Sequence, residues 1–164
     1  MRIFGIDPGL AGAIAILDEK KIVDVIDLPT MSDGKKNKKQ LNSAHLSQYI
    51  SKNILDINNT VVVVEQVNAM PGQGVTSMFN FGQTFGAIKG ISATLNLPIF
   101  FVRPSKWKKH FELINSSKDA SRTKVIEMYP SFAEKLSKKK DVNKSDAILI
   151  ARFFNETGSK DDLK

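Results

Sequence analysis

Three acidic residues stand directly beside apolar runs, where an isolated charge is costly. Asp7 follows the mainly apolar run 2–6, Glu65 follows four valines, and Asp146 precedes the apolar run 147–151. Burying a carboxylate is unfavourable unless it is paired, hydrogen-bonded or bound to a metal ion. If the three acids converge, they form an anionic pocket that divalent cations would neutralise. Such a pocket suits metal-assisted hydrolysis of a phosphodiester, which needs no covalent protein nucleophile.

Each acid taken alone also has a structural explanation. Asp7 begins an Asp-Pro-Gly turn, in which its carboxylate would accept hydrogen bonds from backbone amides. Glu65 at the end of a strand can be solvated or ion-paired. Asp146 falls at the third position of a helix capped by Asn143, where a carboxylate favours the helix dipole. The metal-site interpretation therefore depends on the three side chains lying together in the fold.

The charge of the chain favours a polyanionic partner. Its 164 residues carry a net charge of +7, with a pI near 9.6, although solubility alone would also account for that charge. Lysines cluster around aromatic residues, a pattern typical of nucleic-acid surfaces. We expect DNA contacts from a set of basic and aromatic residues, each of which has an ordinary surface role as its alternative: Lys106, Trp107, Lys108, Lys109, Lys118 and Arg122. Lys118 is the one we expect to contact the scissile phosphate during catalysis.

The composition is that of one globular domain. We predict a single domain over 1–158 and a frayed tail over 159–164. There is no cysteine, so disulfides and thiolate metal sites are excluded. No membrane span, signal peptide or organellar targeting segment is evident, and we expect a cytoplasmic protein, in the host cytoplasm if the chain is viral.

The apolar periodicity predicts the elements that would position the acids. Three strands over 2–7, 13–17 and 21–28 form an antiparallel meander, and 61–65 and 99–102 are buried strands. Residues 32–39 form a polar loop. Helices are expected in five places: from an N-cap at Ser43, over 79–97, from Pro104, from Ser116 to Met128, and from Asn143 to Asn155. This order predicts a mixed α/β domain with one sheet.

Three motifs, in their order and spacing, carry a family resemblance. GIDPG at 5–9, EQV at 65–67 and SDA at 145–147 resemble the RuvC-type Holliday junction resolvases of the ribonuclease H-like superfamily. The resemblance covers residues 2–154. MPGQG at 70–74 and PSKWK at 104–108 look closer to the phage and organellar branch than to the bacterial enzymes.

The resemblance implies a fold, an activity and a cofactor. The fold is a five-stranded mixed sheet in the order 3-2-1-4-5, flanked by helices. The activity is symmetric nicking of four-way DNA junctions by a homodimer in recombination and repair. Two Mg²⁺ ions per site, replaceable by Mn²⁺, would be held by the residues matching the family's ligands, Asp7, Glu65 and Asp146. A recombination or packaging partner is not identified.

Two departures from the family pattern leave alternatives open. The fourth metal ligand, three residues before the last acid, is Asn143, a weaker ligand than a carboxylate. Asp141 would replace it as a metal ligand and catalytic residue if the preceding loop bends inward, and we favour Asp141. The aromatic wedge expected three residues after the second acid is replaced by Asn68. Met70, Phe79 or Phe81 are the alternative wedges, unless both phenylalanines belong to the core of the next helix.

Gly82, Gly86 and Gly90 recur every four residues along one predicted helix. Such a stripe allows close backbone approach, either to a partner subunit or to the molecule's own sheet.

Two further functions of the chain remain open beside junction resolution. One is a broader structure-specific nuclease on forks, flaps or replication intermediates, and the other is a non-catalytic junction-binding protein.

Overall fold

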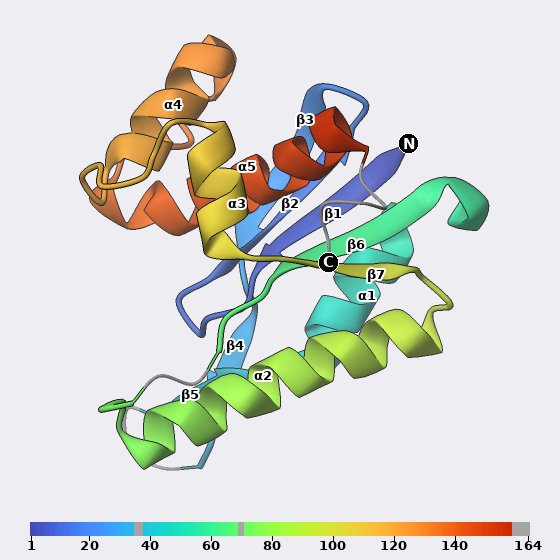
Figure 1. Ribbon diagram of the computed structural model, residues 1–164. Helices are drawn as coiled ribbons and strands as arrows, with labels where there is room; N and C mark the ends of the chain where they lie inside the picture. The colour runs from blue at the N-terminus through green and yellow to red at the C-terminus, as the bar shows by residue number, and fades with distance from the viewer. Residues whose placement is uncertain (35–37, 69–70, 159–164) are drawn as a thin grey trace.

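A five-stranded mixed sheet lies between two layers of helices (Figure 1). The computed structural model describes residues 1–34, 38–68 and 71–158, so the predicted tail at 159–164 and Met70 lie outside the described residues. The strands are β1 (Arg2–Asp7), β2 (Ala13–Asp18), β3 (Lys21–Asp27), β4 (Thr30–Ser32), β5 (Lys39–Leu41), β6 (Thr60–Glu65) and β7 (Ile99–Val102). The helices are α1 (Ser43–Asn53), α2 (Val75–Thr94), α3 (Pro104–His110), α4 (Ala120–Met128) and α5 (Val142–Thr157), with short 3-10 turns at Ile57–Asn59, Pro130–Phe132 and Lys139–Asp141.

The sheet has the predicted topology. Its order is β3-β2-β1-β6-β7, in which β1, β2 and β3 are antiparallel neighbours and β6 and β7 run parallel to β1. Counted along the chain without the small β4–β5 pair, this is the order 3-2-1-4-5 that was predicted. Because β1 and β6 are parallel, their carboxyl ends meet at one edge, and these ends carry Asp7 and Glu65.

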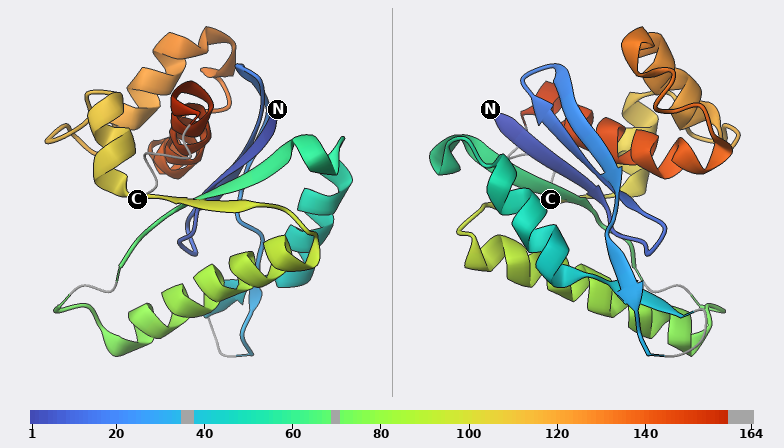
Figure 2. Two further views of the ribbon diagram at one scale, coloured as in Figure 1. Left: turned by 45° about the vertical axis from the view of Figure 1, so that its right-hand side comes forward. Right: turned by 180° about the vertical axis from the view of Figure 1, so that it is seen from behind.

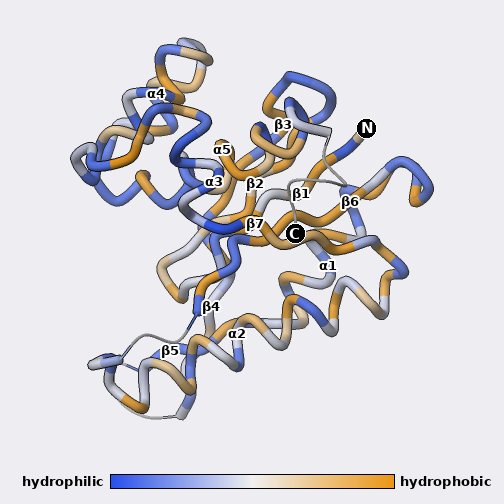
Figure 3. Tube along the Cα trace, in the orientation of Figure 1, coloured by the Kyte–Doolittle hydropathy of each residue, from blue (hydrophilic) through white to orange (hydrophobic). Residues whose placement is uncertain are grey.

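Alternation along the central strands produces a hydrophobic core on each face of the sheet. Ile3 and Val63 contribute to the core beneath α3, α4 and α5, whereas Phe4 and Val62 contribute to the core beneath α1 and α2. Figure 2 shows these helices on opposite faces of the sheet. In Figure 3 the strands of the sheet and α5 are mainly hydrophobic, and the turn between β2 and β3 is hydrophilic.

Several boundaries differ from the prediction for local reasons. Asn42, not Ser43, caps α1, because its side chain accepts a hydrogen bond from the backbone N–H of His45 at 3.0 Å. Helix α2 begins at Val75, one turn before the predicted Phe79. Helix α4 begins at Ala120 with no side-chain cap, so the predicted start at Ser116 is wrong.

The region predicted as one polar loop, 32–39, is flanked by a short antiparallel pair. Strands β4 and β5 pair from Thr30↔Leu41 to Ser32↔Lys39. Only Leu41 of this pair is buried, so the apolar pattern that signals a strand is almost missing from it. The pair lies beside α2, at the end of the molecule where β1 and β6 finish (Figures 1 and 2).

No helix within the described residues is both long and apolar enough to cross a membrane.

Candidate active site

Close packing of α5 on β1 brings the third acid to the other two. Gly5, in the middle of β1, faces α5 so closely that an added Cβ would lie 2.3 Å from the carbonyl oxygen of Ala147 and 2.6 Å from the Cβ of Ala151. Only glycine permits this approach. The charges of both Glu65 and Asp146 raise the pKa of Asp7, which shows that the three carboxylates converge.

The turn after β1 is equally tight. The N–H of Gly12 donates to the carbonyl oxygen of Gly9 at 2.8 Å, and an added Cβ at Gly12 would lie 2.0 Å from the backbone oxygen of Asp7. The N–H of Gly9 points at Asp7 Oδ1 from 3.5 Å. The glycine pattern therefore fixes the turn that holds Asp7, as the sequence indicated.

Burial and the nearby negative charges raise the pKa of Asp7 strongly. Desolvation is the main cause, followed by repulsion from Glu65 and then from Asp146, and together they raise the pKa of Asp7 from 3.8 to about 7. The Gly9 amide and the Lys108 ammonium act in the opposite direction but are weaker. A carboxylate this reluctant to ionise gains much from a bound cation.

Glu65 is held by an indole. Burial raises its pKa, while a hydrogen bond from Trp107 Nε1 to Oε1 at 2.9 Å and the charge of Lys108 act against that rise. Trp107 is fully buried, with 0% of its surface exposed. The prediction that Trp107 contacts DNA is therefore wrong, because α3 turns this ring toward the sheet and leaves none of it exposed. Its role is to position Glu65.

Asp146 lies farther into its helix than predicted. Helix α5 begins at Val142, so Asp146 is its fifth residue rather than its third, beyond the turn in which a helix dipole stabilises a carboxylate. Burial raises the pKa of Asp146 to about 6; the neighbouring Ser121 hydroxyl acts against this rise, and Glu65 adds to it. Asp146 Oδ1 is buried and has no hydrogen-bond partner among the described residues. The helix-capping explanation of this acid is thus lost.

Three converging carboxylates and an orphaned buried oxygen make a donor set that suits Mg²⁺ or Mn²⁺. As placed, the side chains are not closed around a common point: within the described ranges no group of three or more His, Cys, Asp or Glu residues has metal-site spacing. Asp7 instead faces Gly9, and Glu65 faces Trp107. Repulsion between unneutralised carboxylates favours such separate arrangements.

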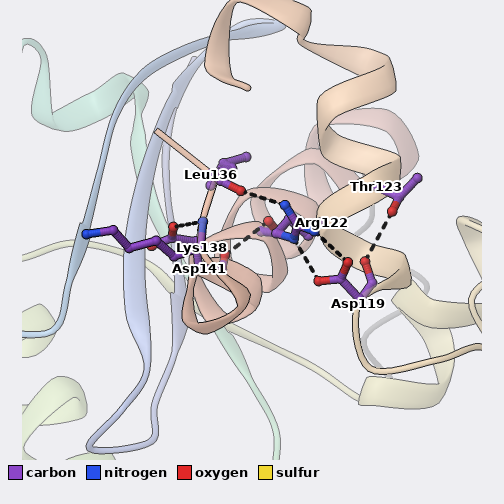
Figure 4. Close-up of polar contacts among 7 residues, drawn as sticks. Asp119, Arg122, Thr123, Leu136, Lys138 and Asp141 are labelled. Carbon is purple, nitrogen blue, oxygen red and sulfur yellow. Dashed lines mark hydrogen bonds and ion pairs between the residues drawn. The ribbon is translucent and has the colours of Figure 1, made fainter. Parts of the chain in front are cut away.

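Asp141 is held by donors of its own segment (Figure 4). Its Oδ2 accepts the backbone N–H of Lys138 at 2.9 Å and its Oδ1 accepts Lys144 Nζ at 3.0 Å. Burial acts to raise the pKa of Asp141, but these two donors outweigh it and hold the pKa below its usual value. Asp141 thus closes the 3-10 turn that leads into α5, and each of its carboxylate oxygens already accepts a hydrogen bond there. This disfavours it as the fourth ligand.

Asn143 lies much closer to the site. Its Nδ2 donates to the carbonyl oxygen of Ala11 at 2.6 Å, which ties the start of α5 to the turn after β1. It also lines a cavity of about 420 Å³ into which Asp146 opens. Of the two candidates for the fourth ligand position, the fold brings Asn143, not Asp141, beside the acids.

The four predicted lysines divide into three groups. Lys108 lies nearest the acids, since its charge lowers the pKa of all three, and its Nζ is 5.3 Å from the Trp107 ring centroid. Lys118 is exposed and lines the cavity beside Asp146, whereas Lys106 and Lys109 are exposed on α3. The sequence did not single out Lys108 from its neighbours, because its direction depends on how α3 packs.

Arg122 is already engaged within the protein (Figure 4). Its Nε and Nη2 donate to the two carboxylate oxygens of Asp119 at 2.7 and 2.6 Å, and its Nη1 donates to the carbonyl oxygen of Leu136 at 3.0 Å. The guanidinium thus joins the start of α4 to the segment that precedes α5. Its predicted contact with DNA would require these bonds to be shared or broken.

The two phenylalanines proposed as wedges have different surroundings. Phe81 stacks on Phe85, with ring centroids 6.3 Å apart, and Phe85 in turn contacts Phe101. Phe79 is 65% exposed on α2, so it is not a core residue. The remaining candidate, Met70, is outside the described residues. Phe81 is half-buried, belongs to neither core cluster and lines a cavity of about 450 Å³. Phe79 and Phe81 therefore both stay wedge candidates.

The fold is that of solved RuvC structures. No family model and no curated protein sequence matches this chain. Among solved structures, Thermus thermophilus RuvC in complex with a Holliday junction substrate is similar with a TM-score of 0.60 and 17% sequence identity, over 97% of each chain. A second Thermus thermophilus RuvC structure is similar with a TM-score of 0.55 and 17% identity, over 96% of this chain and 97% of the other. The chain thus has the RuvC-type fold that was predicted.

Proposed function

We propose that this protein is a metal-dependent endonuclease that resolves four-way DNA junctions. The observation that carries the proposal is the convergence of Asp7, Glu65 and Asp146. Burial raises the pKa of all three, and repulsion from neighbouring carboxylates adds to the rise at Asp7 and Asp146. In a structure with the same fold, RuvC is bound to a Holliday junction substrate. The net charge of +7 also favours DNA, a polyanion, as the binding partner.

In this proposal the chain's own residues bind and orient the DNA strand. Lys108 faces the three acids, and its ammonium would hold a phosphate oxygen against the cluster. Lys118 borders the adjoining cavity and would bind the same or the next phosphate. Trp107 holds Glu65 in place through its indole N–H. The carboxylates do not bind the DNA phosphate directly, because both groups are negatively charged and repel each other.

Asp7, Glu65 and Asp146 would hold the cofactor, with Asn143 as the neighbouring neutral ligand. Two Mg²⁺ ions, or Mn²⁺ in their place, would supply Lewis acidity toward the phosphodiester and an activated water. Asp146 Oδ1, which is buried without a hydrogen-bond partner among the described residues, is the oxygen of this set most in need of a cation.

The test is cleavage of a mobile four-way junction in Mg²⁺, with a fork, a flap and a linear duplex as alternative substrates. We expect paired nicks at symmetric positions on the junction. Asp7→Asn, Glu65→Gln and Asp146→Asn should abolish cleavage while junction binding persists, and Asp141→Asn should retain cleavage. Cleavage that survives in all three first variants would exclude this site. Equal cleavage of forks and flaps would favour the broader nuclease, and junction binding without any cleavage or Mg²⁺ binding would favour a non-catalytic role.

A homodimer through the glycine face of α2 would supply the symmetry of the two nicks. An added Cβ at Gly82, Gly86 or Gly90 would meet no atom within 4 Å, so the three glycines do not serve packing on the molecule's own sheet. Each costs roughly 1 kcal/mol relative to alanine in a helix interior. Close approach of a second α2 would offset this cost, and Gly86→Glu should then shift the molar mass measured by light scattering from dimer to monomer. A monomeric wild-type protein would refute the assignment.

A further inference from the structure

Three cavities adjoin one another along the end of the sheet that carries the acids. The first lies beside Asp146 and shares Asn143 with a second, also about 420 Å³, over the turn after β1. The second shares Leu10 and Lys39 with a third, of about 190 Å³, between β5 and α2. Because neighbouring hollows share lining residues, the three adjoin in one row, here called the groove, that leads from Asp146 to the middle of α2.

Lysines accompany this groove along its length. Lys118 lines the first cavity, Lys140 the second, and Lys39 both the second and the third. The acid of the second cavity, Asp27, has an ion-pair partner in Lys144 Nζ at 3.5 Å. A groove with a lysine at each of its cavities that begins beside Asp146 is suited to a nucleic-acid backbone.

The third cavity differs from the others in its chemistry. Three of the six polar residues that line it carry side-chain amides, Gln40 on β5 and Asn80 and Gln83 on α2; the other three are Lys39, Ser43 and Thr84. The Gln40 amide also donates to the carbonyl oxygen of Ser32 at 3.5 Å. Asn80 and Gln83 are three residues apart on α2, so their side chains lie on one face of the helix. No hydrogen bond of their side chains is found within the described part of the chain. Amides do not bind phosphates tightly, but they match the donor and acceptor pattern of a base edge.

The size of the third cavity limits its occupant. At about 190 Å³ it is smaller than the roughly 300–1,000 Å³ of sites for drug-sized ligands. One planar base fits this scale better than a whole nucleotide cofactor. Lys39 at the boundary with the second cavity stands where the phosphate attached to such a base would pass.

We propose that this amide cavity reads one base of the DNA strand that runs through the groove, and that Asn80 and Gln83 are specificity-determining residues. Adenine is the base that side-chain amides of Asn and Gln recognise in a bidentate manner, through an N–H donor and a ring-nitrogen acceptor. Lys39 contacts the adjoining phosphate and contributes affinity without sequence preference. The inference rests on the proposed function, since it takes the acids as one end of the strand's path.

The experiment is a binding selection that does not depend on cleavage. A four-way junction with randomised base pairs around the branch point is offered to the protein in an Asp7→Asn background, and the bound fraction is sequenced. The variants are Asn80→Ala, Gln83→Ala and Lys39→Ala, with Gln48→Ala as the matched control. Gln48 is exposed on α1 and lines none of the three cavities. Alanine is a better helix former than Asn or Gln, so the α2 variants should fold.

We expect the parent to prefer adenine at one position, and Asn80→Ala or Gln83→Ala to reduce that preference by about 5- to 150-fold. Lys39→Ala should weaken binding to all sequences alike, and Gln48→Ala should change nothing. The same base preference in parent, Asn80→Ala and Gln83→Ala, or no preference in the parent, would overturn the inference while leaving junction cleavage intact. If the preference changes as expected but wild-type protein cleaves no junction, the proposed function fails and the base site stands. Absence of any binding to branched DNA would overturn both.

Discussion

Replacing Asp7 by asparagine should stabilise the metal-free protein while it removes activity. The pKa of Asp7 is raised from 3.8 to about 7 by burial, by Glu65 and by Asp146. A raised carboxylate pKa means that the folded state holds its proton more tightly than the unfolded state does. Stability therefore falls as pH rises from about 4 to about 7 and is level above that range. Asparagine is close in shape, can accept the same Gly9 amide through its oxygen, and has no charge to bury.

The size of this effect follows from the shift. Roughly three pKa units at 1.36 kcal/mol each give up to about 4 kcal/mol above pH 7, and almost nothing at pH 4. Urea denaturation in EDTA at pH 4, 6 and 8, for wild type and Asp7→Asn, would measure the difference in the free energy of unfolding. Added Mg²⁺ should then stabilise the wild type and not the variant, since only the wild type retains the full ligand set.

Asp141→Asn provides a matched control with the opposite sign. Hydrogen bonds from the Lys138 amide and the Lys144 ammonium hold the pKa of Asp141 below its usual value. Its contribution to stability is therefore present above the ordinary carboxyl pKa and is lost as pH falls below it, so this variant should be less stable than wild type at pH 8. An Asp7→Asn protein that is less stable than wild type at pH 8, or whose advantage does not grow between pH 4 and pH 8, would refute the electrostatic reasoning about the cluster.

Three other predictions follow from single contacts. Trp107→Phe keeps most of the ring volume but removes the donor to Glu65, so it should cost about 1–3 kcal/mol of unfolding free energy at pH 8 and less at pH 4, by the same urea method; an equal cost at both pH values would contradict this. Gly5→Ala would force a Cβ to 2.3 Å from the Ala147 oxygen, so thermal denaturation should show a loss of about 1–3 kcal/mol or more, and an unchanged midpoint would mean that α5 does not pack as described. Lys118→Met should lower the slope of log binding constant against log salt concentration by about one, as measured by junction binding between 50 and 200 mM salt, and an unchanged slope would exclude a phosphate contact.

Some features of the site were predictable because local sequence decides them. The four valines before Glu65 favour a buried strand because they are β-branched and apolar. The glycines after Asp7 fix a turn that few other residues allow. The sheet order was predicted through the family resemblance of the motifs and is confirmed. Boundaries were less predictable, since β4 and β5 have almost no apolar alternation to indicate them.

Other features depended on which way a side chain turns in the packed molecule. Sequence placed Trp107 with its lysine neighbours on a DNA surface, but α3 packs so that the indole is buried against Glu65. Sequence also favoured Asp141 over Asn143, because a carboxylate is the better metal ligand. The 3-10 turn before α5 instead uses both Asp141 oxygens, for Lys138 and Lys144.

The sequence by itself determined the identity of the three acids, the strands that carry two of them and the basic character of the chain. These are properties of residue types and of short apolar runs, which act within a few residues. Only the tertiary structure decided that Asp146 lies near Asp7, because this depends on α5 approaching β1 across Gly5, which is 142 positions earlier in the chain than Ala147. The perturbed pKa values follow from this contact, since desolvation and repulsion exist only once the carboxylates share a buried site.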